Sequence, residues 1–343
     1  MNITRKLLLF ALLPCFLGCT KHAKEGQVAV RIGYFPNITH SQALIGFSAA
    51  RGDFQKDFGD SARIDTKIFN AGPSAIEALF AGELDLVYIG PNPAINGFVK
   101  SRGEALRIIA GATSGGAVLV ARHGVTIISP ADWIGKRIAS PQLGNTQDVA
   151  LRSYLASNGL LSKENGGAVT IIPTQNPDIL TLFHREEIDG AWVPEPWGAR
   201  LVQEAGGTII LDERDLWPDR RFVTANIIVG NKFLHEHPLL VKQFLKTHVR
   251  LTQWINANPH EARSVANAEI QRLTGKALQA EILESAWARL DCTYDPVKTS
   301  LFRSADRAYA LGFLGQIKPD LSGIFDLRLL NEVLSESHLP SIQ

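Results

Sequence analysis

Cysteine is scarce in this sequence, which has three cysteines in 343 residues. A leader that ends before Cys19 would leave two of them, Cys19 and Cys292. If Cys19 carries lipid, no disulfide can form within the remaining chain. The stability of the protein must then come from packing, and a chain of this length has enough apolar residues to supply it.

The chain has almost no excess of charge, because it contains 35 basic and 34 acidic residues and its formal net charge is +1. No basic stripe interleaves with aromatic residues, so we expect no nucleic-acid partner. The content of 45% hydrophobic and 20% charged residues is ordinary for a soluble globular protein. The length allows one large or two medium domains.

The familiar motifs of enzymes are also absent. The sequence contains no Walker loop and no H-E-x-x-H, and residues 46–50, GFSAA, lack the final glycine of a G-x-S-x-G elbow. His235-Glu236-His237 lies just before a helix that Pro238 would begin, which indicates a solvated helix start rather than a metal site. Cys292 has no histidine nearby in sequence and is interpreted as buried packing. We therefore expect a protein that is not an enzyme and that holds no metal or cofactor.

The first 18 residues differ from the rest of the chain. Arg5 and Lys6 precede the run LLLFALLPCFLG, which is too short to span a bilayer as an ordinary helix and predicts an export signal over residues 1–18. Residues 16–19, FLGC, resemble the lipobox of bacterial lipoproteins, although Phe16 departs from the usual aliphatic residue; a plain secretory signal is the alternative. We expect an exported protein, in the periplasm or on the outer face of the cell membrane, anchored by lipid on Cys19 through a polar tether, residues 19–27.

From Val28 onward, β-type apolar runs alternate with polar turns and amphipathic helical stretches. In residues 74–80, for example, Ile76, Leu79 and Phe80 share one helical face. This alternation predicts an α/β fold with mainly parallel sheets flanked by helices. The expected strands are 28–35, 64–69, 84–90, 106–110, 117–121, 137–139, 169–172, 188–193, 208–211 and 222–229.

Two parts of this region can be laid over one another. Residues 73–85, PSAIEALFAGELD, match residues 177–189, PDILTLFHREEID, without a gap at an offset of 177 − 73 = 104. Thr39 falls on Thr146 at a similar offset, 107. The match is either a duplication or the likeness of any two β-turn-α units. Both interpretations predict two similarly built lobes.

After Val229 the pattern changes to helices alone, which we expect to pack on the first lobe. The chain would leave that lobe near residues 113–116, TSGG, and return near residues 224–226, with Gly115 and Gly116 suited to a hinge. We assign residues 28–112 and 226–343 to the first lobe and residues 113–225 to the second, with a cleft between them. The expected C-terminal helices are 238–257, 259–273, 277–290, 296–311 and 327–334.

Ligands of open parallel sheets bind beyond the carboxyl ends of the strands, where loops lead into helices. The loops expected there are rich in Asn, Thr, Ser, Gln, Gly and Pro and contain no lysine or arginine. The first turn of a helix offers unpaired N–H groups and about half a positive charge, so such a loop can bind an oxyanion without a cationic side chain. These loops are residues 36–42, 70–74, 90–93, 142–148 and 194–197.

The polar residues of these loops have a second interpretation. Asn145 can cap its helix with Asp148 at the third position, an arrangement that needs no ligand. Asp148 would also compete with an anion for the same donors. The same choice between cap and site applies to Asn37, Thr39 and Ser74. Repetition of the pattern in two facing lobes favours a binding cleft.

Glu195 and Trp197 stand on a proline-stiffened turn directly after an apolar strand. Glu195 could receive an amine or reach a partner across the cleft, and Trp197 could wall the apolar part of a ligand. The alternatives are lobe packing for Trp197 and a helix-dipole contact for Glu195. His40, at a probable helix start, is either a donor or a surface histidine.

Three stretches, NAGPSAIEALFAGELDLVYIGPNPAING, ASPQLGNTQDVALRSYL and EIDGAWVPEPWGARLV, resemble the substrate-binding proteins of the nitrate, sulfonate and taurine group of bacterial ABC importers. The resemblance extends from about Val28 to Leu334. It implies two α/β lobes of the type II periplasmic-binding-protein fold, which close on a small oxyanion and deliver it to a membrane permease with its ATPase. The expected ligand-binding residues, from the loops and from the resemblance, are Asn37, Thr39, His40, Gln42, Gly72, Pro73, Ser74, Pro91, Asn92, Thr113, Ser114, Asn145, Thr146, Gln147, Glu195 and Trp197.

We therefore expect a monomeric receptor for a small anion, first of all an aliphatic sulfonate or a nitrate-like or taurine-like ligand. The alternative is the same fold binding a neutral or amine-bearing heterocycle, such as a pyrimidine precursor, which Glu195, Trp197 and the absence of cationic loop residues favour. A structural or adhesive lipoprotein would not need paired polar loops.

Overall fold

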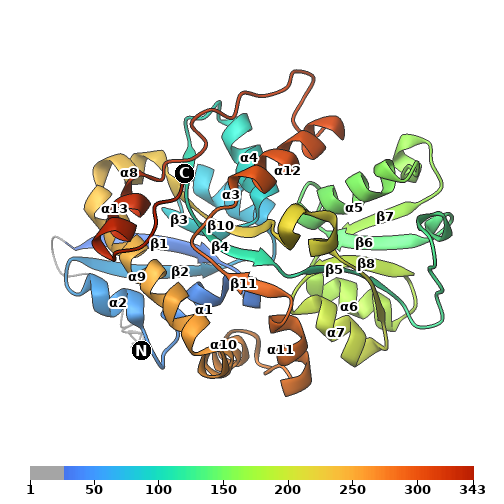
Figure 1. Cartoon of the computed structure of the whole chain (residues 1–343), viewed down its shortest axis with the longest axis horizontal. Helices are drawn as coiled ribbons and strands as arrows, with labels where there is room; N and C mark the ends of the chain where they lie inside the picture. The colour runs from blue at the N-terminus through green and yellow to red at the C-terminus, as the bar shows by residue number, and fades with distance from the viewer. Residues whose placement is uncertain (1–26) are drawn as a thin grey trace, which may run out of the picture.

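The computed structural model describes residues 27–343. They form two sheets that lie side by side, with helices around each (Figure 1). The predicted export signal, Cys19 and most of the tether lie outside the described residues. Between residues 27 and 343, no helix is both long enough and apolar enough to cross a membrane.

Every strand predicted from the sequence is present, and the described residues add one short strand, β11, at a sheet edge. The bounds are β1 (Val28–Tyr34), β2 (Ala62–Ile68), β3 (Leu86–Ile89), β4 (Leu106–Gly115), β5 (Ala117–Ala121), β6 (Arg137–Pro141), β7 (Thr170–Thr174), β8 (Gly190–Pro194), β9 (Thr208–Asp212), β10 (Val223–Gly230) and β11 (Leu290–Cys292). The six-stranded sheet has the order β11-β4-β10-β3-β1-β2, and the five-stranded sheet has the order β7-β6-β8-β5-β9.

Helices connect the strands and dominate the chain after β10. Their bounds are α1 (Ser41–Gly46), α2 (Asp53–Phe58), α3 (Gly72–Phe80), α4 (Pro91–Lys100), α5 (Thr146–Ser157), α6 (Asn176–His184), α7 (Trp197–Ala205), α8 (Asn231–Glu236), α9 (Pro238–Ala257), α10 (Pro259–Thr274), α11 (Ala280–Trp287), α12 (Lys298–Ala310) and α13 (Arg328–Glu336). Pro91, Pro238 and Pro259 begin their helices, because a first-turn residue does not need the N–H that proline lacks.

The sheets are mixed rather than mainly parallel. β1 pairs in parallel with β2 and β3, and β6 pairs in parallel with β7 and β8. β10 runs antiparallel to β3 and β4, and β5 runs antiparallel to β8 and β9. The prediction therefore holds only for one half of each sheet. The other half of each sheet contains β10 or β5, the strands on which the chain enters a sheet after crossing between the lobes. These strands run antiparallel to their neighbours.

The two lobes have the same plan. α3 begins at Gly72 and α6 at Asn176, while β3 begins at Leu86 and β8 at Gly190, so the offset of 104 residues (176 − 72 and 190 − 86) holds in both elements. Equivalent hydrogen bonds precede the equivalent strands. The Arg31 N–H donates to Asp85 Oδ2 at 2.8 Å, and the Arg137 N–H donates to Asp189 Oδ2 at 2.8 Å.

The C-terminal helices pack on the first sheet, as predicted. Phe244 of α9, Ile270 of α10 and Leu330 of α13 share one buried cluster with Ile32 of β1. In the second lobe, α5 covers one face of the sheet and α6 and α7 cover the other (Figure 1). Each lobe thus has its own apolar core, which lets the lobes keep their shape independently of each other.

The chain crosses from the first sheet to the second at Gly115 and Gly116. Their φ angles are +75° and +78°, a conformation that residues with a Cβ rarely adopt. The chain returns through residues 213–222 and enters β10 at Val223. The first sheet therefore extends three residues past each boundary expected from the sequence (115 − 112 and 226 − 223). The assignment of residues to lobes stays a prediction.

The substitution Gly115→Ala is expected to destabilise the protein more than Gly166→Ala. Both glycines have positive φ, +75° and +79°, so each alanine would cost about 1–2 kcal/mol in the left-handed region. A Cβ on Gly115 would also lie 2.6 Å from the Arg289 carbonyl oxygen, whereas a Cβ on Gly166 would meet nothing within 4 Å. Urea unfolding measures both losses, and equal values would contradict a tight contact at the crossing.

Candidate functional site

A small cavity lies between the two sheets, beyond the carboxyl ends of β1, β3, β6, β7 and β8. Its volume is about 20 Å³, room for about one water-sized group. No acid, lysine or arginine stands among the residues that line it. These residues are Phe35, Asn37, Thr39, His40, Asn70, Gly90, Asn145, Thr146, Gln147, Asn176, Pro194 and Thr224.

His40 is held as a neutral hydrogen-bond donor. The Phe35 N–H donates to His40 Nδ1 at 2.9 Å, so the proton of the neutral ring is on Nε2. The residue is 2% exposed, and burial lowers the pKa of His40 to about 3. The rings of Phe35 and Tyr88 lie beside it, with centroids 4.5 and 6.0 Å away. His40 is therefore neither a cation nor a surface histidine.

The first turn of α5 has free amides at the cavity. Asn145 Oδ1 accepts from the Thr146 N–H at 2.9 Å, and the Val149 N–H donates to the Asn145 carbonyl at 3.0 Å. Within residues 27–343, no hydrogen bond to a protein acceptor is seen from the Gln147 or Asp148 N–H, and of these two residues Gln147 lines the cavity. The predicted cap and the predicted site thus coexist, because Asn145 satisfies one amide and leaves the next two available.

Asp148 does not compete for these amides, contrary to the concern that the sequence raises. Its Oδ1 accepts from the Ser140 hydroxyl at 2.7 Å, and its Oδ2 accepts from the Gly144 N–H at 2.9 Å. Arg152 Nε lies 3.1 Å from Oδ2 and neutralises the buried carboxylate. The acid is turned away from the cavity, where it stabilises the loop that precedes α5.

Two polar atoms in the cavity wall have no hydrogen-bond partner in the described part of the chain. They are Thr146 Oγ1 and Asn176 Oδ1, in residues that are 5% and 4% exposed. A buried polar group without a partner costs about 1–3 kcal/mol, so such groups are normally satisfied by water or a ligand. Both atoms therefore favour a polar guest in this cavity.

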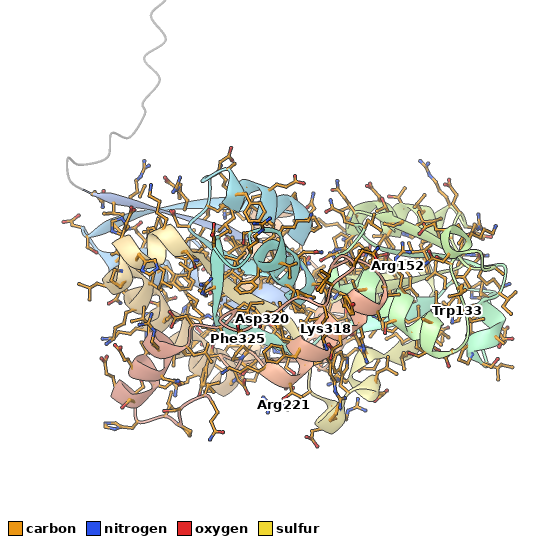
Figure 2. All side chains as sticks on the ribbon, turned by 90° about the horizontal axis from the view of Figure 1, so that it is seen from above. Trp133, Arg152, Arg221, Lys318, Asp320 and Phe325 are labelled. Atoms are coloured by element: carbon orange, nitrogen blue, oxygen red, sulfur yellow. The ribbon has the colours of Figure 1, made fainter. Side chains whose placement is uncertain are left out.

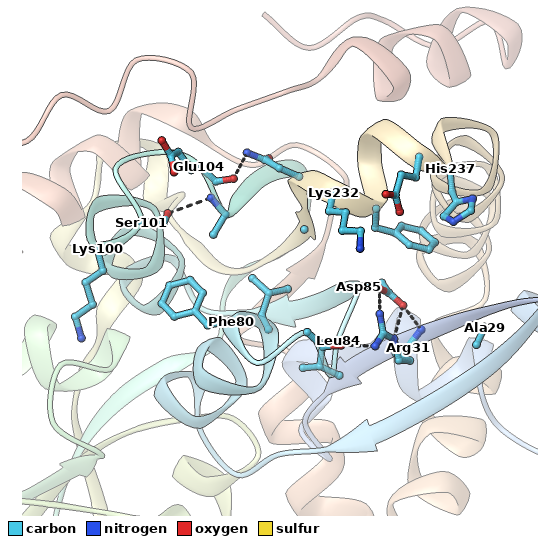
Figure 3. Close-up of a pocket in the computed structure, with 17 residues that line it drawn as sticks. Ala29, Arg31, Phe80, Leu84, Asp85, Lys100, Ser101, Glu104, Lys232 and His237 are labelled. Atoms are coloured by element: carbon cyan, nitrogen blue, oxygen red, sulfur yellow. Dashed lines mark hydrogen bonds and ion pairs between the residues drawn. The ribbon is translucent and has the colours of Figure 1, made fainter.

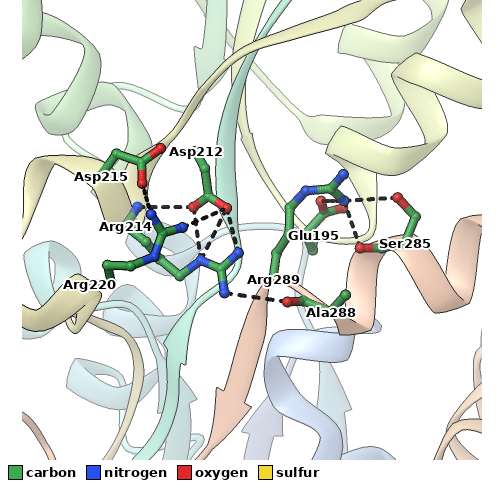
Figure 4. Close-up of polar contacts among 8 residues, drawn as sticks. All are labelled: Glu195, Asp212, Arg214, Asp215, Arg220, Ser285, Ala288 and Arg289. Carbon is green, nitrogen blue, oxygen red and sulfur yellow. Dashed lines mark hydrogen bonds and ion pairs between the residues drawn. The ribbon is translucent and has the colours of Figure 1, made fainter.

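Glu195 joins the two lobes and does not line the cavity. Its Oε1 accepts from Arg289 Nη1 at 3.0 Å (Figure 4), and its Oε2 accepts from the Ala199 N–H at 2.9 Å. Nearby, Arg214 of the second lobe donates to the Ala288 carbonyl of the first at 3.3 Å. Burial raises the pKa of Glu195, and the Ala199 N–H and Arg289 oppose that rise. Of the three roles considered for Glu195, the structure shows two, the contact across the cleft with Arg289 and the contact with a first-turn amide of α7, that of Ala199.

Trp197 closes one side of the cleft with a hydrogen bond. Its Nε1 donates to Asn37 Oδ1 at 3.1 Å, and beside it Asn70 Nδ2 donates to Gln175 Oε1 at 2.9 Å. On another side of the interface, the Arg152 guanidinium of α5 faces the first lobe (Figure 2), with its central carbon 5.9 Å from the Phe313 ring centroid. Contacts between the lobes thus surround the cavity.

Six of the residues predicted to bind ligand line the cavity: Asn37, Thr39, His40, Asn145, Thr146 and Gln147. Other predicted residues support the wall from behind. Gln42 Nε2 donates to the Ala112 carbonyl at 2.8 Å inside the first lobe, and Thr113 Oγ1 donates to the Thr39 carbonyl at 2.6 Å. The remaining predicted residues that do not line the cavity are Gly72, Pro73, Ser74, Pro91, Asn92 and Ser114, in addition to Glu195 and Trp197.

Several predicted residues that do not line the cavity have local structural roles. Ser74 Oγ donates to the Ala71 carbonyl at 3.0 Å, and Asn92 Nδ2 reaches the Ser304 carbonyl at 3.5 Å. A Cβ on Gly72 would lie 2.3 Å from Pro93 Cγ, so this glycine permits the close approach of α3 and α4. Ser114 is buried, and its hydroxyl has no partner in residues 27–343.

Sequence reasoning missed several wall residues. Asn70, Gly90 and Pro194 belong to loops that were identified, but they were not selected within them. Asn176 could have been found, because the 104-residue offset places it at the start of α6 as Gly72 stands at the start of α3. Phe35 and Thr224 have no such signal, since they reach the cavity only through the packing of β1 and β10. The complete set of missed residues is Phe35, Asn70, Gly90, Asn176, Pro194 and Thr224.

A larger hollow of about 740 Å³ lies at the other end of the first sheet (Figure 3). It is lined by charges of both signs, among them Lys100, Glu104 and Lys232, and the Arg31–Asp85 ion pair (2.6 Å) forms part of its wall. The hollow is at the amino ends of the parallel strands β1 and β3, and the helix start that lines it, in α8, follows the antiparallel strand β10. Its position argues against a ligand site of the kind that open α/β sheets form.

No group of three or more His, Cys, Asp or Glu residues is placed to hold a metal ion between residues 27 and 343. Cys292 is buried, and burial raises the pKa of its thiol to about 12. A thiol of this kind is a poor nucleophile.

The chain matches known binding proteins in sequence and in structure. The model of the NMT1-like family matches residues 23–270. The taurine-binding periplasmic protein of Escherichia coli (strain K12) is 29% identical over 210 residues, which are 61% of this chain and 62% of that protein.

Two solved structures have the same fold. The alkanesulfonate-binding protein SsuA from Xanthomonas axonopodis pv. citri bound to MOPS has a TM-score of 0.71 and 20% identity, over 89% of this chain and 100% of that chain. The periplasmic nitrate-binding protein NrtA from Synechocystis PCC 6803 has a TM-score of 0.71 and 13% identity, over 92% of both chains. The predicted periplasmic-binding-protein fold is confirmed.

His40 is expected to stay neutral, with its proton on Nε2, at pH 5. Because the folded-state pKa of about 3 lies below the usual 6.5, His40 contributes stability that is complete above pH 6.5 and is lost as the pH falls toward 3. Ring-nitrogen NMR between pH 8 and 5 checks this, with exposed His123 as the control ring. A proton on Nδ1, or titration of His40 near pH 6.5, would contradict the assignment.

The Glu195–Arg289 pair is expected to behave as a buried ion pair. Arg289→Met should lower the free energy of unfolding by about 3–5 kcal/mol, since it leaves a buried carboxylate unpaired, and the loss should be larger at pH 8 than at pH 5. The double variant Glu195→Gln with Arg289→Met should recover much of the loss, since no charge remains buried. Urea titrations of the single and double variants measure this, and a double variant as unstable as Arg289→Met would refute it.

Proposed function

This chain belongs to the NMT1-like family, and on that basis we propose that it is the solute-binding component of an ABC importer. Its ligand is a small oxyanion held between the lobes, first of all an aliphatic sulfonate, with taurine-like compounds and nitrate as the nearest relatives. The observation that carries this proposal is a cavity between two sheets whose wall has hydrogen-bond donors but no charged side chain. The role is binding and release rather than catalysis.

Neutral donors suit an oxyanion that must be released again. The Gln147 and Asp148 amides lie at the positive end of α5, where a negative group gains about 0.3–1 kcal/mol or more when partly buried. His40 Nε2–H and the Thr146 hydroxyl add donors from opposite lobes. A sulfonate group has three oxygens that can accept hydrogen bonds from these donors. Two similar proteins, one taurine-binding and one alkanesulfonate-binding, support sulfonates as the chemical class of the ligand.

Movement of the lobes gives the ligand access. The contacts that cross the interface include Trp197 to Asn37, Asn70 to Gln175, Arg289 to Glu195 and Arg214 to the Ala288 carbonyl. Gly115 and Gly116 lie where the chain crosses and can absorb the backbone change of opening. A ligand that touches donors of both lobes stabilises the closed form, because it binds that form better than the open one. The closed form is then the signal that a permease reads.

We also propose the setting in which this receptor works. Residues 1–18 direct export, Cys19 carries the lipid anchor, and residues 19–27 tether the monomeric receptor to the periplasmic or outer face of the membrane. The permease and ATPase of the importer are its partners. Residues 28–112 with 226–343 and residues 113–225 move as the two lobes.

The alternative ligand, a neutral or amine-bearing heterocycle, was favoured by Glu195, Trp197 and the absence of cationic loop residues, and of these only Glu195 could pair with an amine. That carboxylate is occupied by Arg289 and the Ala199 N–H, and it lies outside the cavity wall. We therefore keep the anion as the proposed ligand.

Thermal unfolding in the presence of a panel of anions tests the function. A bound sulfonate at about a hundred times its Kd should stabilise the protein by roughly 2.7 kcal/mol. Thr146→Val removes a cavity donor at constant volume and should reduce the stabilisation, whereas Thr181→Val, at an exposed position of α6, should leave it unchanged. Absence of any shift with sulfonates, nitrate and bicarbonate would eliminate the anion assignment.

A further inference from the structure

A second hollow lies next to the cavity, in the interface between the lobes. It is a groove of about 340 Å³ between α7 of the second lobe and the segment that joins α10 to α11 of the first. α7 and α11 are in contact with each other (Figure 1). The groove therefore widens or narrows when the lobes move, as the cavity does.

The groove and the cavity are neighbours along several chain segments. Asn70 lines both. Asn37 and Asn176 line the cavity, and the residues next to them in sequence, Pro36 and Pro177, line the groove. Asn37 lines the cavity and Trp197 lines the groove, so the bond from Trp197 Nε1 to Asn37 Oδ1 lies on the boundary between the two. A second hydrogen bond, from Asn70 Nδ2 to Gln175 Oε1, also crosses the interface there.

The two spaces differ in size in a way that matters for a ligand. A cavity of about 20 Å³ admits about one water-sized group, and no organic body, when the lobes are as close as they are here. Ligand sites usually measure about 300–1,000 Å³, and the groove of about 340 Å³ falls in that range. An organic anion thus has room for its body only outside the cavity.

The walls of the groove are suited to an uncharged body. Seven of its twelve lining residues are apolar, namely Pro36, Pro177, Pro196, Trp197, Ile270, Ala277 and Leu278. The three charged residues that also line it are paired with one another. Arg200 Nε lies 2.8 Å and Lys276 Nζ 3.8 Å from the carboxylate of Glu204.

The aromatic wall is itself held in place. The Arg200 guanidinium carbon lies 4.6 Å from the centroid of the Trp197 ring, and the indole N–H is bound to Asn37. An indole with a cation over one face and a hydrogen bond on its N–H has little rotamer freedom left to lose on binding.

We propose that this groove is the second half of the ligand site and takes the aliphatic or aromatic body of an organosulfonate whose headgroup occupies the cavity. The inference rests on the proposed function, and it adds that the preferred ligands carry a body larger than that of taurine. Because Trp197 and Leu278 come from different lobes, closure clamps the body between them.

The chain-length dependence of binding tests the proposal. Calorimetry on the mature protein with the linear series from ethanesulfonate to octanesulfonate should show Kd falling about fourfold per added methylene until the groove is full. Ala277→Trp, which fills the groove, should flatten this dependence, and Thr274→Trp, at another groove position, serves as a second filling variant. Ala280→Trp, at an exposed position just outside the groove, is the matched control and should keep the wild-type dependence.

The outcomes separate the two claims. If no sulfonate binds the wild-type protein, the proposed function fails and the groove assignment falls with it. If sulfonates bind but Kd does not depend on chain length, or if both filling variants keep the wild-type dependence, the groove assignment alone is overturned. A dependence that is lost in the filling variants and kept in Ala280→Trp supports it.

Discussion

The wall of the cavity has no side chain with a formal charge, and this constraint governs how its surroundings are built. A dipole attracts an anion only when it points toward it, so each donor must be held in a fixed direction. The Phe35 N–H fixes the proton of His40 on Nε2. Asp148 binds the Gly144 N–H and thereby holds the loop that presents the amides of α5. Rigid support behind the wall replaces the cationic side chains that other anion sites use.

The charged residues closest to the cleft are paired with one another. Asp148 is paired with Arg152 inside the second lobe, and Glu195 with Arg289 across the interface. The pairing removes two carboxylates that would otherwise repel an anion. The second pair also links lobe closure to the satisfaction of a buried charge, because opening the interface separates Glu195 from its partner. The same ion pair therefore affects both the electrostatics of the site and the motion of the lobes.

Much of the fold could be predicted from the sequence because strands and helices differ in period and in their boundary residues. Every expected strand is present, and Pro238 and Pro259 mark helix starts correctly. The mixed pairing of β10 and β5 could not be predicted, since strand direction depends on where the chain crosses between sheets. In the site, the 145–147 turn and His40 were recognisable because helix starts have a local signature. Thr224 was not, because its strand reaches the cavity only through neighbours distant in sequence.

The sequence by itself determined that the chain builds two α/β lobes joined through glycines, with polar loops that contain no lysine or arginine at the ends of the strands. Local periodicity and cap chemistry carry that information. Only the tertiary structure decided which loop residues face the cavity and which support it. Glu195 meets Arg289, 94 residues further along the chain, and Trp197 meets Asn37, 160 residues before it. Such partners are brought together by the packing of whole lobes, which no single stretch of sequence records.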